Sequence, residues 1–155
     1  MVMIARALLI LMVMSAPAPL RAETLFQCSF GARQVSVTRD GARLTYGYGR
    51  PGRAELTLTG DAASGSVFYH RTLYARGEDQ TLRFTNGDYS YVIFNGWSAP
   101  NLYLEGARDF SGLLILRGGR VIRRLNCREG GDFIEYPIFA TLPRDTENRV
   151  PEEPR

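Results

Sequence analysis

The sequence predicts an all-β protein: a single antiparallel meander that closes into a small barrel or sandwich, followed by a short C-terminal apron and a disordered tail. Apolar and polar residues alternate over short segments, which is the period of a half-buried strand. Turn-forming dipeptides separate these segments at spacings of roughly ten residues, as in other all-β domains. No segment between the turns has the spacing of an amphipathic helix. Because consecutive hairpins place neighbouring strands side by side, the chain order predicts a meander.

The clearest hairpin is the segment Leu44–Leu58. Pro51 fixes the φ angle that the second position of a turn requires, and Gly52 allows the positive φ of the third position of a type II turn. Apolar residues recur at every second position on both sides of this turn, so one face of each strand is expected to point into the core.

Four further sites have turn chemistry: Asp40-Gly41, Gly77-Glu78-Asp79, Asn86-Gly87 and Gly118-Gly119. Asn86-Gly87 is the strongest hairpin signal, because both residues tolerate the positive φ angles of a type I′ turn. Residues 60–66 and 96–100 are expected to be loops. The remaining strands are expected at residues 24–30, 34–38, 67–74, 81–85, 88–94, 101–105, 112–117 and 120–127.

The first 22 residues have the pattern of a signal peptide. Arg6 precedes a short apolar run, and Ala22 is the expected cleavage point. The protein is therefore expected to be periplasmic or secreted, without a stable membrane span. The formal charge of the whole chain is +3. Loss of Arg6 and Arg21 would leave +1, so the net charge does not imply a nucleic-acid partner.

Cys28 and Cys127 are the two cysteines of the chain and lie at the two ends of its regular part. In an exported chain such a pair predicts a structural disulfide. The bond would bring the first and last strands together and so favours a closed or nearly closed barrel over residues 23–128. Residues 129–142 are expected to form the apron that packs on the barrel. Residues 143–155 contain too few apolar side chains to fold and are expected to be disordered.

Catalytic chemistry is weakly represented, so no catalytic residue, metal ligand or cofactor is expected. His70 is the single histidine, and no cysteine or carboxylate stands at ligand spacing to it. Serines are present, but no Gly-x-Ser-x-Gly motif surrounds one of them. An enzyme, such as a hydrolase, is the alternative class.

The second half of the chain is rich in aromatic residues, and Trp97 is the single tryptophan. These side chains pack in the core or across strands, or else they form a binding surface for a sugar or a protein. Trp97 is the best candidate for the second role, because its expected loop would expose it.

Two resemblances follow from these motifs. The run from Tyr46 to Leu56, with Cys28 before it, resembles small exported bacterial proteins of unassigned function over residues 24–128. Export, one small β-domain and Ser64-Gly65 followed by Tyr69 resemble the bacterial inhibitors of C-type lysozymes. In that family the motif is Ser-Gly-x-x-Tyr, one residue shorter than here, and Lys-Gly follows where this chain has Arg76-Gly77.

The second resemblance implies that Ser64 and Arg76 reach towards the catalytic carboxylates of a lysozyme, which hydroxyl and cationic donors suit. Tyr69 is the third candidate residue for binding this partner. The loop that contains Ser64 and the turn that contains Arg76 flank the strand expected at residues 67–74. The two side chains are therefore expected at opposite ends of that strand unless it bends. The function expected from the sequence is a non-catalytic exported binding or structural domain. Its partner would be a protein such as lysozyme or a cell-envelope glycan. Lysozyme inhibition is the first alternative and hydrolysis the second.

Overall fold

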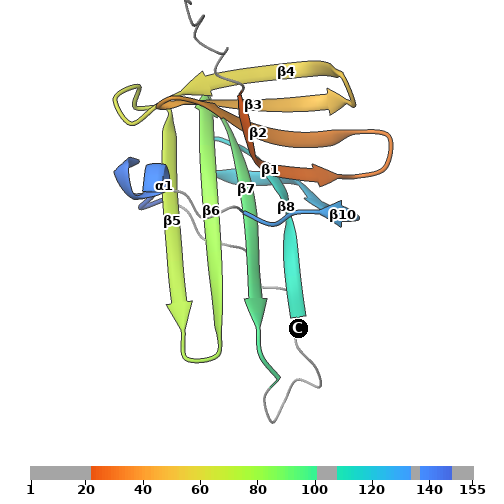
Figure 1. Ribbon diagram of the computed structural model, residues 1–155, viewed down its shortest axis with the longest axis vertical. Helices are drawn as coiled ribbons and strands as arrows, with labels where there is room; N and C mark the ends of the chain where they lie inside the picture. Colours follow the sequence, from red (N-terminus) through yellow and green to blue (C-terminus); the bar gives the residue numbers. More distant parts are fainter. Residues whose placement is uncertain (1–21, 101–107, 134–136, 148–155) are drawn as a thin grey trace, which may run out of the picture.

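The computed structural model describes residues 22–100, 108–133 and 137–147, and it confirms an all-β fold. Two five-stranded antiparallel sheets make up the described chain (Figure 1). The first sheet has the order β10-β1-β2-β3-β4 and contains β1 (Glu23–Ser29), β2 (Gln34–Asp40), β3 (Arg43–Arg50), β4 (Arg53–Gly60) and β10 (Glu129–Gly130). The second sheet has the order β5-β6-β7-β8-β9 and contains β5 (Val67–Tyr74), β6 (Gly77–Asn86), β7 (Tyr89–Ser98), β8 (Arg108–Arg117) and β9 (Arg120–Asn126). The predicted signal peptide and the strand expected at 101–105 lie outside the described residues.

The predicted disulfide between Cys28 and Cys127 is confirmed, with Cα atoms 5.4 Å apart and a sequence separation of 99. The closed barrel that it was expected to favour is not formed, because the described strands make two separate sheets. The reason is that β10 pairs with the edge of β1, where Cys28 lies opposite Gly130. The bond therefore connects two packed layers instead of two edges of one sheet.

The main core lies between the two sheets. Tyr46 of β3 is fully buried there, with its ring centroid 5.5 Å from those of both Phe84 and Tyr91 of the second sheet. Aliphatic side chains such as Leu82 and Ile93 fill the space around these rings. The alternation of these residues along their strands is what the sequence pattern predicted.

The second sheet extends beyond the first. Figure 1 shows the first sheet lying across one end of β5–β8, while the other end of these strands projects past it. We call the projecting end, from Arg71 to Gln80, Asn95 to Ser98 and Arg108 to Ser111, the projecting half. We call the side of the second sheet that faces the first sheet its inner face.

The hairpin turns agree with the sequence at two sites. Gly52 has φ 74° after Pro51, as a type II turn requires, and Gly118 and Gly119 have φ 56° and 75°, as in type I′. The Asn86-Gly87 prediction is wrong by one residue, because Asn86 pairs with Tyr89 and is the last residue of β6.

Only the first central residue of that turn, Gly87, has a positive φ, at 57°. A positive φ at the first central position alone identifies a type II′ turn, so the type I′ assignment is corrected. The turn expected at Gly77-Glu78-Asp79 is also wrong. These residues begin β6, and Ala75 and Arg76 form the turn. A Cβ on Gly77 would lie 2.5 Å from the Trp97 carbonyl oxygen, so glycine serves close strand approach there.

The C-terminal segment pairs with an edge strand of each sheet. Residues 129–130 pair with β1, and α1 (Pro137–Thr141) sets Phe139 against Tyr69 of β5 with ring centroids 5.0 Å apart. The disordered tail was expected to begin at residue 143, but Pro143–Glu147 runs along β5. The Tyr69 N–H donates to the Pro143 carbonyl at 3.0 Å, and the Asp145 N–H donates to the Tyr69 carbonyl at 2.9 Å. Residues 148–155 lie outside the described part.

Candidate functional site

The three residues of the inhibitor-like motif are not brought together. Ser64 precedes β5, Tyr69 lies within it, and Arg76 is in the β5–β6 turn. An eight-residue strand spans roughly 25 Å. Figure 1 shows the loop before β5 and the turn after it at opposite ends of the second sheet. One partner surface would therefore have to be long to contact both Ser64 and Arg76.

Each of these side chains also has an internal partner. The Ser64 hydroxyl donates to the Asp61 carbonyl at 2.8 Å, and the Tyr69 hydroxyl donates to Gln80 Oε1 at 2.6 Å. The Arg76 guanidinium donates to the carbonyl of Pro100. These contacts stabilise a loop, a strand pair and a turn respectively.

His70 follows Tyr69 in β5, so its side chain lies on the opposite face of the second sheet from that of Tyr69. Two contacts hold it there. Its Nδ1 lies 3.1 Å from the Asp145 carbonyl oxygen, and its Nε2 lies 3.0 Å from the Thr72 hydroxyl. Among the described residues, no group of three or more histidine, cysteine or acidic side chains is placed to hold a metal ion. His70 thus serves to attach the C-terminal segment to β5.

Trp97 is the predicted candidate whose surroundings point to binding. It lies in β7 and not in the expected loop, yet 48% of its surface is exposed. The pairing of the strands places it in a row of four residues across the inner face: Leu73, Glu78, Trp97 and Asp109. Leu73 is 68% exposed. An indole is therefore presented between two carboxylates on a rigid sheet.

A second row of polar residues lies between this row and the first sheet: Arg71, Gln80, Asn95 and Ser111. Arg71 donates to both carboxylate oxygens of Glu78, at 2.7 and 3.0 Å, and Gln80 Nε2 donates to Glu78 at 2.8 Å. These bonds hold the Glu78 carboxylate in a single orientation. The Asn95 Oδ1 atom is buried and accepts no hydrogen bond within the described chain.

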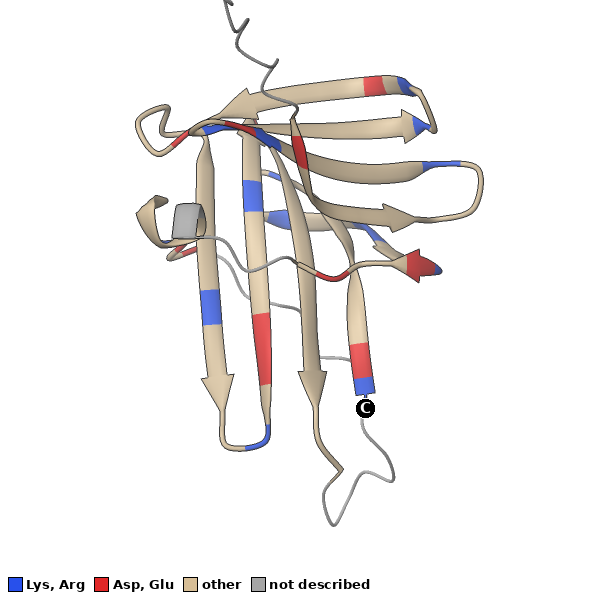
Figure 2. Ribbon diagram, in the orientation of Figure 1, with Lys and Arg blue, Asp and Glu red and all other residues tan. Residues whose placement is uncertain are grey.

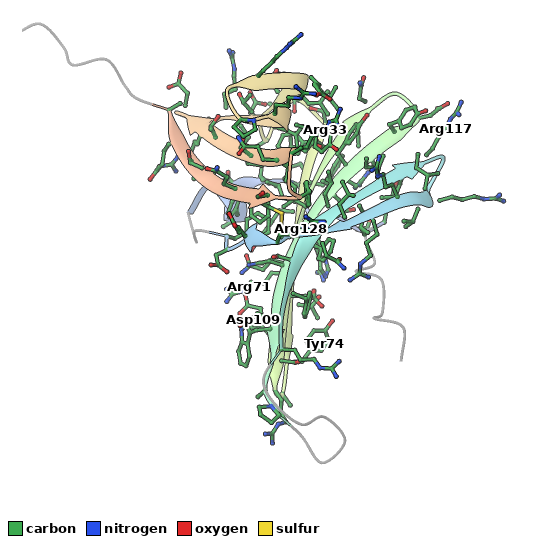
Figure 3. The ribbon with its side chains drawn as sticks, turned by 90° about the vertical axis from the view of Figure 1, so that its right-hand side faces the viewer. Arg33, Arg71, Tyr74, Asp109, Arg117 and Arg128 are labelled. Atoms are coloured by element: carbon green, nitrogen blue, oxygen red, sulfur yellow. A yellow bond between two sulfur atoms is a disulfide. The ribbon has the colours of Figure 1, made fainter. Side chains whose placement is uncertain are left out.

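The pictures place these side chains on one side of the sheet. In Figure 3, Arg71 and Asp109 point to the side on which the first sheet lies, whereas Tyr74 points to the other side. In the projecting half, Figure 2 shows a basic residue (blue) on β5 and acidic residues (red) on β6 and β8. We call the two rows together the Trp97 surface.

Packing covers part of the opposite face of the projecting half, on which Tyr74 is 58% exposed. A Cβ on Gly96 would lie 2.3 Å from the ring of Phe110, so that ring rests directly on the glycine. The Tyr74 hydroxyl donates to the buried carboxylate of Asp79 at 2.5 Å, and this hydrogen bond raises the pKa of Tyr74. The inner face presents two exposed apolar side chains, Leu73 and Trp97, beside carboxylates.

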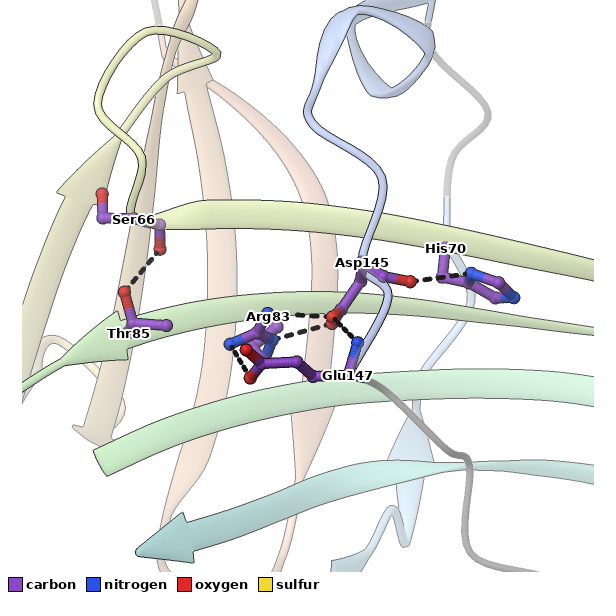
Figure 4. Close-up of polar contacts among 6 residues, drawn as sticks. All are labelled: Ser66, His70, Arg83, Thr85, Asp145 and Glu147. Carbon is purple, nitrogen blue, oxygen red and sulfur yellow. Dashed lines mark hydrogen bonds and ion pairs between the residues drawn. The ribbon is translucent and has the colours of Figure 1, made fainter. Parts of the chain in front are cut away.

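A hollow of about 430 Å³ lies beside Arg83 on the outer face of the second sheet. Arg83 donates two hydrogen bonds to the buried Asp145 carboxylate, at 2.8 and 2.9 Å (Figure 4). The Glu147 carboxylate lies 3.4 Å from the Arg83 guanidinium. The guanidinium also stacks on Phe68 at 4.4 Å. Because its charge is already neutralised by the C-terminal segment, this hollow is a weaker candidate than the Trp97 surface.

Comparison of the chain with protein-family models, with curated proteins and with solved structures found no match. No helix among the described residues is long and apolar enough to cross a membrane. That finding and the disulfide are compatible with an exported protein. Sequence reasoning identified Trp97, but it missed Glu78 and Asp109, whose proximity depends on strand register.

Proposed function

We propose that this protein is a non-catalytic exported binding domain whose Trp97 surface binds a cell-envelope glycan. The observation that carries the proposal is the half-exposed Trp97 side chain between the cross-strand carboxylates of Glu78 and Asp109. The first sheet covers only part of the inner face (Figure 1), and Leu73 and Trp97 are exposed on the remaining part.

The chemistry of this surface suits a sugar. An indole offers a flat apolar face with the area to cover the C–H groups of a pyranose ring. Carboxylates accept hydrogen bonds from sugar hydroxyls. The Arg71 and Gln80 bonds fix the Glu78 carboxylate, whose side chain is 12% exposed, and Asp109 supplies the second carboxylate beside Trp97. Groups on paired strands keep their spacing better than groups on loops, which favours recognition of a defined ligand.

The non-catalytic part of the proposal is supported by the way polar groups are used. Both ring nitrogens of His70 have partners, and Ser64 is bonded within its own loop. Neither residue faces the other across a hollow, as a nucleophile and its base must. A hydrolase would need groups other than these.

The single tryptophan allows a direct test. Soluble peptidoglycan fragments titrated into the protein should change its tryptophan fluorescence and saturate. Trp97→Ala, which must be followed by calorimetry, should weaken binding about tenfold or more, because the stacking face is lost. Ile122→Ala, an exposed apolar residue on β9, is the matched control and should bind normally. Equal affinity of the Trp97→Ala protein, or no saturable signal, would contradict the proposal.

Lysozyme inhibition is the second candidate, favoured by the position of the Arg76 turn at the free end of the projecting half (Figure 1). A protruding turn with a cationic side chain suits an acidic cleft. In this mode of inhibition Ser64, at the other end of β5, does not contact the lysozyme. Arg76→Ala should therefore reduce inhibition of bacterial cell-wall lysis, whereas Ser64→Ala should not. Full lysozyme activity at micromolar excess of the protein would exclude this candidate.

A further inference from the structure

The charges of this chain are distributed unevenly along the β8–β9 hairpin. Between Asp109 and Glu129 the sequence contains arginines at positions 117, 120, 123, 124 and 128 and no acidic residue. The net charge of +3 for the whole chain conceals this cluster. We call residues 117–124, which form the turn and most of β9, the arginine tip.

The arginines of the tip differ in their partners from four arginines elsewhere in the chain. Arg33, Arg39, Arg71 and Arg83 each pair with a carboxylate. Within residues 22–100, 108–133 and 137–147, the tip arginines have no such pair. Arg117 lies 5.5 Å from the ring of Tyr89, and Arg124 lies 5.1 Å from the ring of Phe94. Their positive charge therefore remains available to an external anion.

Two neighbouring aliphatic residues are exposed at the same place. Val121 is 51% and Ile122 is 56% exposed. The register of β9 shifts here: Arg123 pairs with Ile115 and Val121 with Leu116, so Ile122 has no residue opposite it. This bulge lets two consecutive side chains reach solvent at the free edge of the sheet.

We propose that the arginine tip docks on an anionic lipid surface. Arginine guanidiniums bind lipid phosphates by paired hydrogen bonds, and a cluster of them is attracted to a negatively charged leaflet. Val121 and Ile122 would enter the boundary between headgroups and acyl chains. A soluble polyanion would contact the arginines alone and leave the aliphatic pair in water. The joint presence of both features therefore favours lipid.

The position of the tip is compatible with simultaneous use of the Trp97 surface. Arg117 pairs with Tyr89 at one end of β8, and Asp109 pairs with Trp97 near the other end. Figure 3 shows the labelled Arg117 far from Asp109. A docked protein would thus hold the Trp97 surface away from the lipid. The lipid proposal does not depend on glycan binding, and either can fail without the other.

Co-sedimentation with vesicles tests the proposal. Wild-type protein should bind vesicles of phosphatidylglycerol and phosphatidylcholine, bind phosphatidylcholine alone weakly, and be released by about 0.5 M salt. An Arg120→Gln, Arg123→Gln protein should lose about thirtyfold in affinity for the anionic vesicles. An Arg43→Gln, Arg53→Gln protein has the same loss of charge on exposed positions of the first sheet and should bind normally. All proteins carry the same first 22 residues, so any contribution of that segment is common to them.

The aliphatic pair separates lipid from other anions. Val121→Ser, Ile122→Ser should weaken vesicle binding about tenfold and leave binding to dextran sulfate unchanged. Urea unfolding and circular dichroism should show that each variant folds. Equal binding to both vesicle types, or equal losses in the Arg43 and Arg53 control, would overturn the proposal. Unchanged vesicle binding by the aliphatic variant would also overturn it and assign the tip to a soluble polyanion.

Discussion

The two halves of the second sheet are built from the same strands but present different chemistry. Under the first sheet, β6 and β7 place Leu82, Phe84 and Ile93 on the inner face, with no more than 1% of each exposed. A few positions further along, the same face carries Glu78 and Trp97. The alternation of side chains is unchanged, and only the covering layer ends. The comparison shows that the candidate site arises where one sheet is longer than the other.

The outer face of the second sheet has a smaller core of its own. Val92, Phe94 and Leu114 form a second buried cluster next to the projecting half, and Phe110 of the projecting half packs against this cluster and over Gly96. Apolar packing of the projecting half is therefore on its outer face, whereas its inner face carries Leu73 and Trp97. Stability should depend strongly on residues of the covered half and weakly on residues of the Trp97 surface.

The largest effect is expected from the disulfide. Replacing Cys28 and Cys127 by serine should lower the free energy of unfolding by about 4–5 kcal/mol, because the bond closes a loop of nearly the whole domain. Urea unfolding with and without reductant measures the loss. Thiol titration of the denatured, unreduced wild-type protein should detect no free thiol, and two free thiols would refute the bond.

The ion pair between Arg83 and Asp145 ranks next. Asp145→Ala should cost about 3–5 kcal/mol, because it leaves an arginine that is only 9% exposed without its buried partner and with only the exposed Glu147 carboxylate beside it. Glu147→Ala is the matched control. Its side chain is 79% exposed and its loss should cost less than about 1 kcal/mol. Similar losses for the two variants in urea unfolding would show that the C-terminal segment is not held by this pair.

Tyr46 supplies a smaller effect of opposite sign. Its hydroxyl is buried and has no hydrogen-bond partner in the described chain, so Tyr46→Phe should stabilise the protein by about 1 kcal/mol. Burial raises the pKa of Tyr46. The unfolded state loses this proton near pH 10, so wild-type stability should fall above that pH. Urea unfolding at neutral pH and at about pH 11 measures this loss, and the free energy of unfolding should fall less for Tyr46→Phe than for the wild type. Tyr48→Phe is the control and should behave as the wild type does. An equal fall in Tyr46→Phe and the wild type would show that Tyr46 does not cause the pH dependence.

The smallest effect is expected on the Trp97 surface. Leu73→Ala should change the free energy of unfolding by less than about 0.5 kcal/mol, because Leu73 is 68% exposed. Trp97→Ala should cost less than the roughly 3–5 kcal/mol of a core tryptophan, because 48% of its surface is exposed. A loss as large as that of a core residue would show that these side chains support the fold, and the distinction between the two halves would fail.

The sequence predicted the local structure well and the register poorly. Pro51-Gly52 and Gly118-Gly119 were assigned correctly, because their turns follow from backbone conformations that few other residues allow. Gly77 was assigned to a turn, since a glycine before two acidic residues is typical of one. Its actual role, close approach to the Trp97 carbonyl, depends on a strand twenty positions away.

The tail shows the limit of composition. Residues 143–155 have the low apolar content of a disordered segment, yet Asp145 is buried, because Arg83 of β6 donates two hydrogen bonds to its carboxylate. The candidate site has the same limit. The exposure of Trp97 was predicted, but its two flanking carboxylates come from neighbouring strands and are set by pairing alone.

The pairing of β10 with β1 has a consequence for how the chain folds. The first strand to be synthesised receives one of its two neighbours only after residue 130 has been made, and Cys28 waits for Cys127. The hairpins within residues 23–60 and 67–126 involve local contacts and can form early, whereas sealing the layers together requires contacts of very high sequence separation. We therefore expect a chain truncated before residue 127 to form the two meanders without stable packing between them. The complete domain should then form in a single late step.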